Sequence, residues 1–308
     1  MENPNTKTRI NGLIVSRTIL EWLCGEPLSG RVLVVFDHAC DLVIPDERVV
    51  ALVTPQVGAG PFNVVVQGTP GLFRDIAPGM PATLTDREIH VGGLVVSLER
   101  AAAWEPRPDW AALRVRRSVI EDHLPDPHAP GLERVPAESL FALLETPPSE
   151  TLPRGSTLAA ARKAIDALRA GWDGNPVRLR EGAERMAGLG SGLTPGGDDF
   201  LTGVMLWAWL AHPAPVDFCR AVTATAAGHT TTLSAAFLRA AARGECSIAW
   251  HALLEAASRG TDAQVTQAVE DVLAHGATSG ADALGGFMWG AFHCGGEVDL
   301  EGIRSLFP

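Results

Sequence analysis

The chain has 308 residues, of which 46% are hydrophobic and 20% are charged, and its formal net charge at pH 7 is −11. This composition is typical of a folded globular protein with a sizeable core, and the length suits one large or two ordinary domains. The acidic balance argues against a nucleic-acid partner or an anionic membrane surface, since both would be repelled, whereas a small anionic substrate could still be bound by local donors.

The cysteines and the apolar runs indicate the compartment. Five cysteines without a C-x-x-C pair predict reduced, mostly buried thiols rather than a disulfide framework. No basic segment leads into an apolar run near the N-terminus, which argues against a secretory signal. The most apolar run, residues 200–210, is too short for a membrane span of roughly 20 residues. We therefore expect a cytoplasmic protein without a membrane segment.

The first third of the chain predicts mainly strands. Helix-like spacing covers residues 12–23, but from Gly30 onward short β-branched runs alternate with glycine and proline turns. These runs predict an all-β unit, a small barrel or a sandwich. In the segment Gly60-Pro-Phe-Asn63, Asn63 could bind a substrate amide or make an Asx turn, and the turn is favoured. The predicted strands lie at residues 32–36, 49–53, 64–66 and 94–98.

The rest of the chain predicts helices. Residues 104–153 are rich in proline and charge and are expected to connect the two parts through one or two short helices. From about residue 158, alanine-rich apolar faces recur at three- and four-residue spacing. The predicted class is therefore α+β, with a mainly β domain in residues 1–150 and a helical domain in residues 151–308. Helices are predicted at residues 159–170, 200–210, 217–227, 233–242, 248–257 and 263–274.

The densest signal is the segment Gly188-Leu-Gly-Ser-Gly-Leu-Thr-Pro-Gly-Gly-Asp198-Asp199, which runs into the apolar helix predicted from Phe200. Five glycines in ten positions cost backbone entropy that only a required geometry would justify. The segment is not a Walker A loop, because the Gly-Lys-Ser/Thr ending is absent. It is not a dinucleotide fingerprint either, because the glycine spacing differs and the preceding residues look helical.

The chemistry expected of this segment is anion binding at a helix N-terminus. Thr194-Pro195 fits an N-cap followed by proline at the first helical position. The amides of Gly196 and Gly197 would then be free to bind phosphate or carboxylate oxygens. The loop glycines Gly190 and Gly192 would let the ligand approach the backbone.

Asp198 and Asp199 follow about one turn into the same helix. They could bind a cation such as Mg²⁺, accept a hydrogen bond from an amide NH₂, or act as a general base. Alternatively, the segment is a helix connection and the two carboxylates only complement the helix dipole. The combination of glycines, Thr-Pro and paired aspartates favours function. No metal spacing is present among the nine histidines, which argues against zinc.

Two further polar segments join the candidate site. Thr278-Ser-Gly280-Ala-Asp282 repeats the pattern Thr-x-Gly-x-Asp of the first segment, either by chance or because two similar helix N-termini converge on one ligand. His275 just before it is a polar contact or a helix C-cap residue. In the cluster His229-Thr-Thr-Thr-Leu-Ser234, one residue could cap the next helix, but the cluster holds more polar groups than a cap needs. The candidates from these segments are His229, Thr232, Ser234, Thr278, Ser279 and Asp282.

These segments together resemble the AllH-type subunit of oxamate carbamoyltransferase. The resemblance rests on the 188–199 motif, the His-Thr-Thr-Thr-Leu-Ser cluster, Thr-Ser-Gly-Ala-Asp, and Gly60-Pro-Phe-Asn63 with Trp104-Glu-Pro in the β part. One departure is that such proteins often carry serine where this chain has Gly196, so a side-chain role at that position is in doubt.

The resemblance implies a role in the breakdown of ureides derived from purines, such as allantoin. Oxalurate and phosphate would give oxamate and carbamoyl phosphate, in an assembly with two other subunits or with further copies of the chain. Positioned amides and hydroxyls would stabilise the tetrahedral centre of this transfer. The rival hypothesis is a non-catalytic scaffold or regulatory subunit whose glycine loop binds a partner chain or a small anionic effector.

Overall fold

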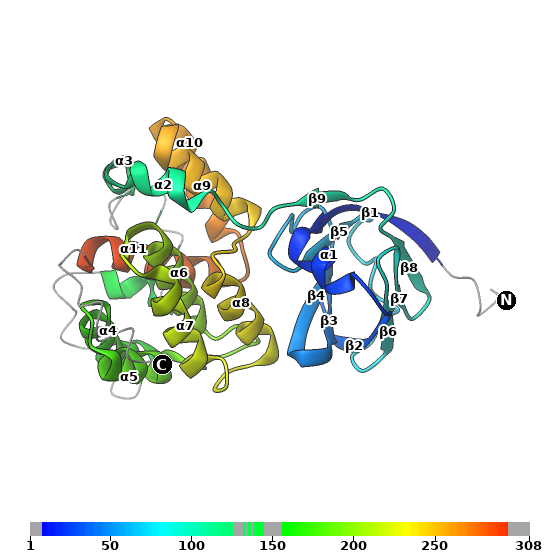
Figure 1. The fold of residues 1–308 in the computed structure, drawn as a ribbon, viewed down its shortest axis with the longest axis horizontal. Helices are drawn as coiled ribbons and strands as arrows, with labels where there is room; N and C mark the ends of the chain where they lie inside the picture. Colours follow the sequence, from blue (N-terminus) through cyan, green and yellow to red (C-terminus); the bar gives the residue numbers. More distant parts are fainter. Residues whose placement is uncertain (1–7, 126–131, 133–134, 137, 145–155, 295–308) are drawn as a thin grey trace. The chain divides into compact units, whose positions relative to one another are not determined.

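The computed structural model describes residues 8–125, 132, 135–136, 138–144 and 156–294. The chain divides into two compact units, Met1–Arg107 and Pro108–Pro308 (Figure 1). The first unit is built from strands and the second from helices, so the predicted α+β class is confirmed. Along the chain, the boundary between the units lies after residue 107, whereas the sequence suggested a boundary near residue 150. The short helices after Pro108 pack with the helical unit.

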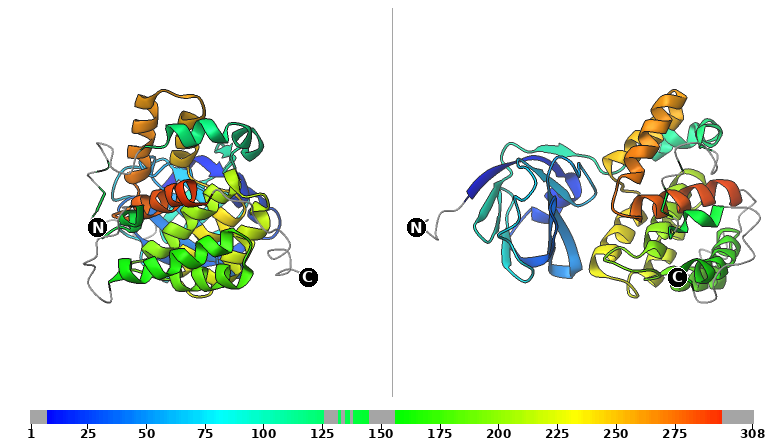
Figure 2. Two further views of the ribbon diagram at one scale, coloured as in Figure 1. Left: turned by 90° about the vertical axis from the view of Figure 1, so that its left-hand side faces the viewer. Right: turned by 180° about the vertical axis from the view of Figure 1, so that it is seen from behind.

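The β unit is a closed barrel. Within the described residues, eight strands pair in the order β5-β4-β3-β2-β6-β7-β8-β1, and the β5–β1 pairing closes the ring (Figure 2). A ninth strand, β9, pairs in parallel with the end of β1. The strands are β1 (Thr8–Ser16), β2 (Leu28–Val35), β3 (Ala39–Ile44), β4 (Arg48–Val53), β5 (Asn63–Val66), β6 (Pro81–Leu84), β7 (Glu88–Val91), β8 (Leu94–Ser97) and β9 (Ala102–Trp104).

Apolar side chains fill the barrel. Alternate residues of the strands, such as Leu42 of β3 and Leu52 of β4, are buried in one core cluster, as expected for strands with one face inward. Helix α1 (Arg17–Leu23) adds Ile19 and Leu23 to the same cluster. The expected helix at residues 12–23 is therefore wrong for its first part, which belongs to β1 and pairs with β5 and β9. Distant pairing partners outweighed the local spacing there.

The helical unit begins with short helices and continues with longer ones that start at recognisable caps. Ser156 caps α4, Asn175 and the following proline start α5, and Thr261 makes a capping box with Gln264 at α10. All predicted helices from residue 159 onward are confirmed. The elements are α2 (Trp110–Val115), α3 (Arg117–His123), η3 (Leu140–Leu144), α4 (Thr157–Trp172), α5 (Pro176–Met186), α6 (Gly196–Ala211), α7 (Pro215–Ala226), α8 (Thr232–Ala242), α9 (Ile248–Arg259), α10 (Asp262–Leu273) and α11 (Ser279–His293).

Helices α6 and α11 form the centre of this unit and pack at very short range. A Cβ placed on Gly203 of α6 would overlap the carbonyl oxygen of Ala283, and one placed on Gly286 of α11 would overlap that of Phe200. Most residues of both helices are buried. Glycine at these contacts lets the two backbones touch, and this close approach brings the two helix N-termini together.

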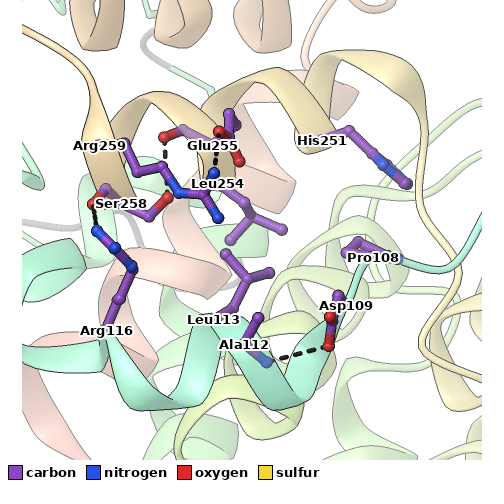
Figure 3. A pocket seen from close by; sticks show the side chains of 10 residues that line it. All are labelled: Pro108, Asp109, Ala112, Leu113, Arg116, His251, Leu254, Glu255, Ser258 and Arg259. Carbon is purple, nitrogen blue, oxygen red and sulfur yellow. Dashed lines mark hydrogen bonds and ion pairs between the residues drawn. The ribbon is translucent and has the colours of Figure 1, made fainter.

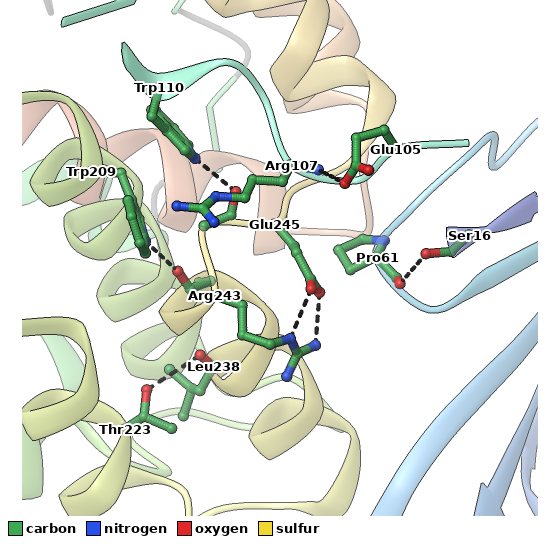
Figure 4. A network of polar contacts seen from close by, with 12 residues as sticks. Ser16, Pro61, Glu105, Arg107, Trp110, Trp209, Thr223, Leu238, Arg243 and Glu245 are labelled. Atoms are coloured by element: carbon green, nitrogen blue, oxygen red, sulfur yellow. Dashed lines mark hydrogen bonds and ion pairs between the residues drawn. The ribbon is translucent and has the colours of Figure 1, made fainter. Parts of the chain in front are cut away.

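A tryptophan pair fixes the turn that links α8 to α9. The rings of Trp110 and Trp209 stack with centroids 6.2 Å apart. The Trp110 indole N–H donates to the Gly244 carbonyl and that of Trp209 to the Ala241 carbonyl, each at 2.8 Å (Figure 4). Gly244 has a φ of +77°, and a Cβ there would lie 2.7 Å from the Trp110 indole nitrogen. The turn therefore requires glycine.

The described cysteines agree with the prediction of reduced, mostly buried thiols. All five cysteines are free, and Cys40, Cys219, Cys246 and Cys294 are buried. Burial raises the pKa of the Cys40 thiol to about 12, so this thiol stays protonated. In the part of the chain that the structure describes, no helix is long and apolar enough to cross a membrane.

Candidate functional site

The glycine-rich loop between α5 and α6 folds back onto the end of α5. Gly188, Gly190 and Gly192 have φ values of +67°, +120° and +92°, which favour glycine. The Gly197 amide donates to the Leu189 carbonyl at 2.8 Å, and a Cβ on Gly197 would overlap the Met186 carbonyl oxygen. These glycines are therefore required by the path of the backbone.

Two details at the start of α6 differ from the prediction. The helix begins at Gly196 with Pro195 as N-cap, and the Thr194 hydroxyl pairs with the Ser279 hydroxyl at 2.8 Å. Thr194 is therefore not the N-cap of α6. Its hydroxyl pairs instead with the hydroxyl of Ser279 at the N-terminus of α11. The expected pair of free amides is also wrong, since the Gly197 amide already has an acceptor in the loop.

Asp198 binds the loop to α6 and α8. Its Oδ1 accepts from the Gly188 amide at 3.1 Å, and its Oδ2 accepts from the hydroxyls of Thr230 at 2.5 Å and Ser234 at 3.0 Å. Burial raises the pKa of the Asp198 carboxyl, and these three hydrogen bonds act in the opposite direction. Both oxygens are used within the protein, so the contacts describe a structural clamp.

Asp282 makes the corresponding clamp at α11. Its Oδ1 accepts from the Ser139 hydroxyl at 2.7 Å and from the Leu140 amide at 2.6 Å. Burial raises its pKa, while the hydroxyls of Ser139 and Thr278 lower it. A Cβ on Gly196 would lie 2.8 Å from the Asp282 Oδ2, so the two repeated segments touch. Each repeat therefore uses its aspartate to hold a distant amide and hydroxyl.

Asp199 has a different environment. It is only 8% exposed, and its Oδ2 has no hydrogen-bond partner. Burial raises the pKa of the Asp199 carboxyl well above its usual range, and the Asp282 and Asp198 carboxyls raise it further, while the Ser279 and Thr194 hydroxyls act against them. The second repeat has Ala283 at the equivalent position. An unsatisfied buried carboxyl oxygen at the convergence of two helix N-termini is the strongest chemical signal in the helical unit.

The α7–α8 turn contributes fewer of the predicted residues. Thr231 is the actual cap of α8, because its hydroxyl accepts from the Ser234 amide at 3.0 Å and donates to the Leu193 carbonyl at 2.5 Å. Thr232 is the first residue of the helix and Ser234 binds Asp198, so neither caps it. The backbone carbonyl of His229 lies against Gly188, but its side chain is exposed, and its catalytic role stays a prediction.

Two candidates satisfy their polar groups locally. The Nδ1 of His275 bonds to the Asp271 carbonyl at 3.0 Å, at the end of α10, in the manner of a C-terminal helix residue. In the barrel, the Asn63 side-chain amide donates to the Gly58 carbonyl at 3.0 Å and braces its own loop, which is a different bond from that of the Asx turn considered above. Ser139 was missed, since a single hydroxyl carries no signal until its partner is known, and Thr230 and Thr231 were part of the predicted polar cluster but were not chosen as candidates.

Within the described ranges no group of three or more His, Cys, Asp or Glu side chains is arranged to hold a metal ion. The oxygens of Asp198 are already bound by amide and hydroxyl donors, and Mg²⁺ binding by the Asp198–Asp199 pair stays one of the alternatives stated above.

Two cavities lie elsewhere in the helical unit. One of about 130 Å³ lies between α2 and α9 and is lined by side chains such as Arg116, His251 and Glu255 (Figure 3). A more open one of about 420 Å³ lies between α9 and α10. Arg116 donates to the Ser258 carbonyl at 3.3 Å, and Arg259 pairs with Glu255 at 3.2 Å. The basic groups there are thus engaged, and the unsatisfied Asp199 defines the better candidate site.

The fold and the site define a class: a closed β-barrel followed by a helical unit in which two glycine-based helix N-termini converge on a buried aspartate. Two family descriptions match the chain, the AllH family N-terminal domain over residues 11–103 and the oxamate carbamoyltransferase subunit AllH over residues 186–291. The chain belongs to the AllH family of oxamate carbamoyltransferase subunits, which confirms the resemblance. The second match contains the loop, Asp199 and Ser279. No solved structure matches the chain significantly.

Proposed function

We propose that this chain is the carbamoyltransferase subunit that binds and orients the ureide substrate, and that Asp199 is its principal substrate-binding group. The single observation that carries this proposal is the buried Asp199 Oδ2 without a hydrogen-bond partner. A buried acceptor without a donor costs about 1–3 kcal/mol, which a substrate N–H would recover. Such a cost is expected at a functional site, where stability is given up for activity.

The proposed reaction is the transfer of the carbamoyl group of oxalurate to phosphate. A phosphate oxygen attacks the ureido carbonyl carbon, the C–N bond to the oxamate nitrogen breaks, and that nitrogen takes the proton of hydrogen phosphate. The products are carbamoyl phosphate and oxamate. Asp199 Oδ2 would accept from the terminal NH₂ and hold the carbonyl in position for attack.

Groups around Asp199 would stabilise the tetrahedral centre. The Thr194 and Ser279 hydroxyls lie 2.8 Å apart and both act on the Asp199 carboxyl. Either hydroxyl can rotate to donate to a developing oxyanion. The Gly196 amide, which has no backbone acceptor within the described residues, can also donate to it. Asp198 and Asp282 would act as positioning residues, since their contacts hold the two helix N-termini in place.

The proposed setting is an assembly of the cytoplasm with other carbamoyltransferase subunits, in the breakdown of purine-derived ureides. The family description names a subunit, which supports a multi-chain enzyme. The free, buried thiols are those of a protein that needs no disulfides. A purely structural subunit would use the same loop without chemical need for Asp199, and this difference allows a test.

The test is the turnover of the assembled enzyme with Asp199→Asn. We expect turnover to fall about 100-fold, which is the size of effect seen when one positioned polar group is lost. The melting temperature should not fall, because the variant removes the cost of a buried acid. Asp271→Asn, at an exposed position of α10, is the matched control and should keep full turnover. Full turnover in Asp199→Asn would contradict the proposal.

A further inference from the structure

The charges around Asp199 limit the ligand it can take. Within the residues that the structure describes, the charged groups that act on the carboxyls of Asp199 and Asp282 are Asp198, Asp282 and Glu138, all of them acidic. A phosphate dianion placed at Asp199 would have these acidic groups as neighbours, and no basic group is among the described groups that act on the Asp199 and Asp282 carboxyls. Coulomb repulsion in a buried site is much stronger than in water, so this arrangement disfavours phosphate.

The backbone amides of the two helix N-termini also disfavour phosphate as the ligand. Phosphate sites at helix N-termini depend on several amides pointing at one anion. In α6 the amides of Asp198 and Asp199 both donate to the Pro195 carbonyl, at 2.9 and 3.3 Å, and that of Gly197 donates to Leu189. In α11 the Gly280 amide donates to the His275 carbonyl at 2.9 Å. The loop thus satisfies most of the amides that an anion would need.

The groups that remain fit a neutral amide. They are an acceptor without a donor, the Asp199 Oδ2, two hydroxyls that can donate or accept, those of Thr194 and Ser279, and the single amide of Gly196. A ureido group presents N–H donors beside a carbonyl acceptor, which is the complementary set. Thr194 and Ser279 are partly exposed and their hydroxyls lie 2.8 Å apart, so a small ligand would reach the nearly buried Asp199 by displacing this contact.

We infer that this site recognises the neutral ureido end of the substrate and that the phosphate is held outside it, on another chain of the enzyme. The inference rests on the proposed function and adds to it a division of labour between subunits. The carboxylate of an acidic ureide would then point away from Asp198, Asp199 and Asp282. Transfer would take place where the ureido carbonyl faces the phosphate of the partner chain.

The first experiment is a thermal-shift titration of the full chain with two probes. Acetylurea carries the acylurea group without an acid, and inorganic phosphate carries the charge without the ureido group. We expect acetylurea at ten times its Kd to raise the melting temperature by about 3–6 °C and phosphate to leave it unchanged. The acetylurea shift should vanish in Asp199→Leu, which has a similar volume and no acceptor, and persist in Asp271→Asn.

Ser279→Ala guards against misfolding of the Asp199 variant, because it removes a single partly exposed hydroxyl. In the assembled enzyme it should raise the KM for the ureide about tenfold and leave the KM for phosphate within twofold. A phosphate shift that disappears in Asp199→Leu, a rise in the KM for phosphate as large as that for the ureide, or no shift with either probe would overturn the inference.

These outcomes separate the inference from the proposed function. If Asp199→Asn abolishes turnover while both KM values rise together in Ser279→Ala, the proposed function stands and the division of labour is wrong. If acetylurea binds through Asp199 but Asp199→Asn keeps full turnover, the ureido site is real and the proposed function is wrong.

Discussion

Replacing Gly203 with alanine should force α6 and α11 apart. The new Cβ would overlap the Ala283 carbonyl oxygen and lie 2.7 Å from the Phe287 nitrogen, below the 3.0 Å that real Cβ contacts respect. Both neighbours are backbone atoms, which cannot rotate away. Overpacking of this kind costs about 1–3 kcal/mol, and the backbone contact places Gly203→Ala at the upper end. Alanine's better helix propensity returns about 1 kcal/mol, so the net loss is about 2 kcal/mol.

The loss is measured as a melting temperature followed by tryptophan fluorescence. For a unit of roughly 200 residues, about 2 kcal/mol lowers the melting temperature by about 4–8 °C. Gly286→Ala, which meets the Phe200 carbonyl from the other helix, should give a similar fall. Gly228→Ala is the control, because its Cβ would meet nothing within 4 Å and its φ is not positive. Equal melting temperatures for Gly203→Ala and Gly228→Ala would refute the close packing of α6 and α11.

Two further predictions concern buried polar groups. Ser139→Ala should lower the free energy of unfolding by about 2 kcal/mol, because Asp282 loses a hydroxyl donor to its buried carboxyl; unchanged urea unfolding would contradict this. Burial raises the pKa of Asp41 in the barrel from 3.8 to about 7. The folded state therefore binds the proton more tightly, and this residue's contribution to stability falls as pH rises from about 4 to about 7. Asp41→Asn should be neutral near pH 4 and stabilising at pH 8, by at most about 4 kcal/mol, as measured by urea unfolding at both pH values; a gain that does not grow with pH would contradict this.

The sequence was informative where local pattern and tertiary structure agree. The runs at residues 49–53 and 64–66 are strands β4 and β5, and the alanine-rich segments are helices. The sequence predicted either a barrel or a sandwich, because short apolar runs indicate strands but do not show which strands pair with each other. Closure depends on the β5–β1 pairing, and the helix-like spacing of the second half of β1 is overridden by pairing with β5 and β9.

The candidate site could be located from the sequence but not resolved. The repeated Thr-x-Gly-x-Asp pattern correctly pointed to two helix N-termini that meet. It could not separate Asp198 from Asp199, which are adjacent and chemically identical. Their difference comes from position on the helix: one side faces Thr230 and Ser234, the other faces α11. Ser139 carries no signal, since its partner lies 143 residues away.

The central claim is that Asp198 holds the structure and Asp199 serves the substrate, and one paired measurement tests it directly. Turnover of the assembled enzyme and melting temperature are measured for Asp198→Ala and Asp199→Ala, which delete the same atoms from adjacent positions. Asp198→Ala should lower the melting temperature clearly, since three donors lose their acceptor. Asp199→Ala should keep the wild-type melting temperature and lose about 100-fold in turnover. Normal turnover in Asp199→Ala, or a fall in its melting temperature as large as that of Asp198→Ala, would contradict the account.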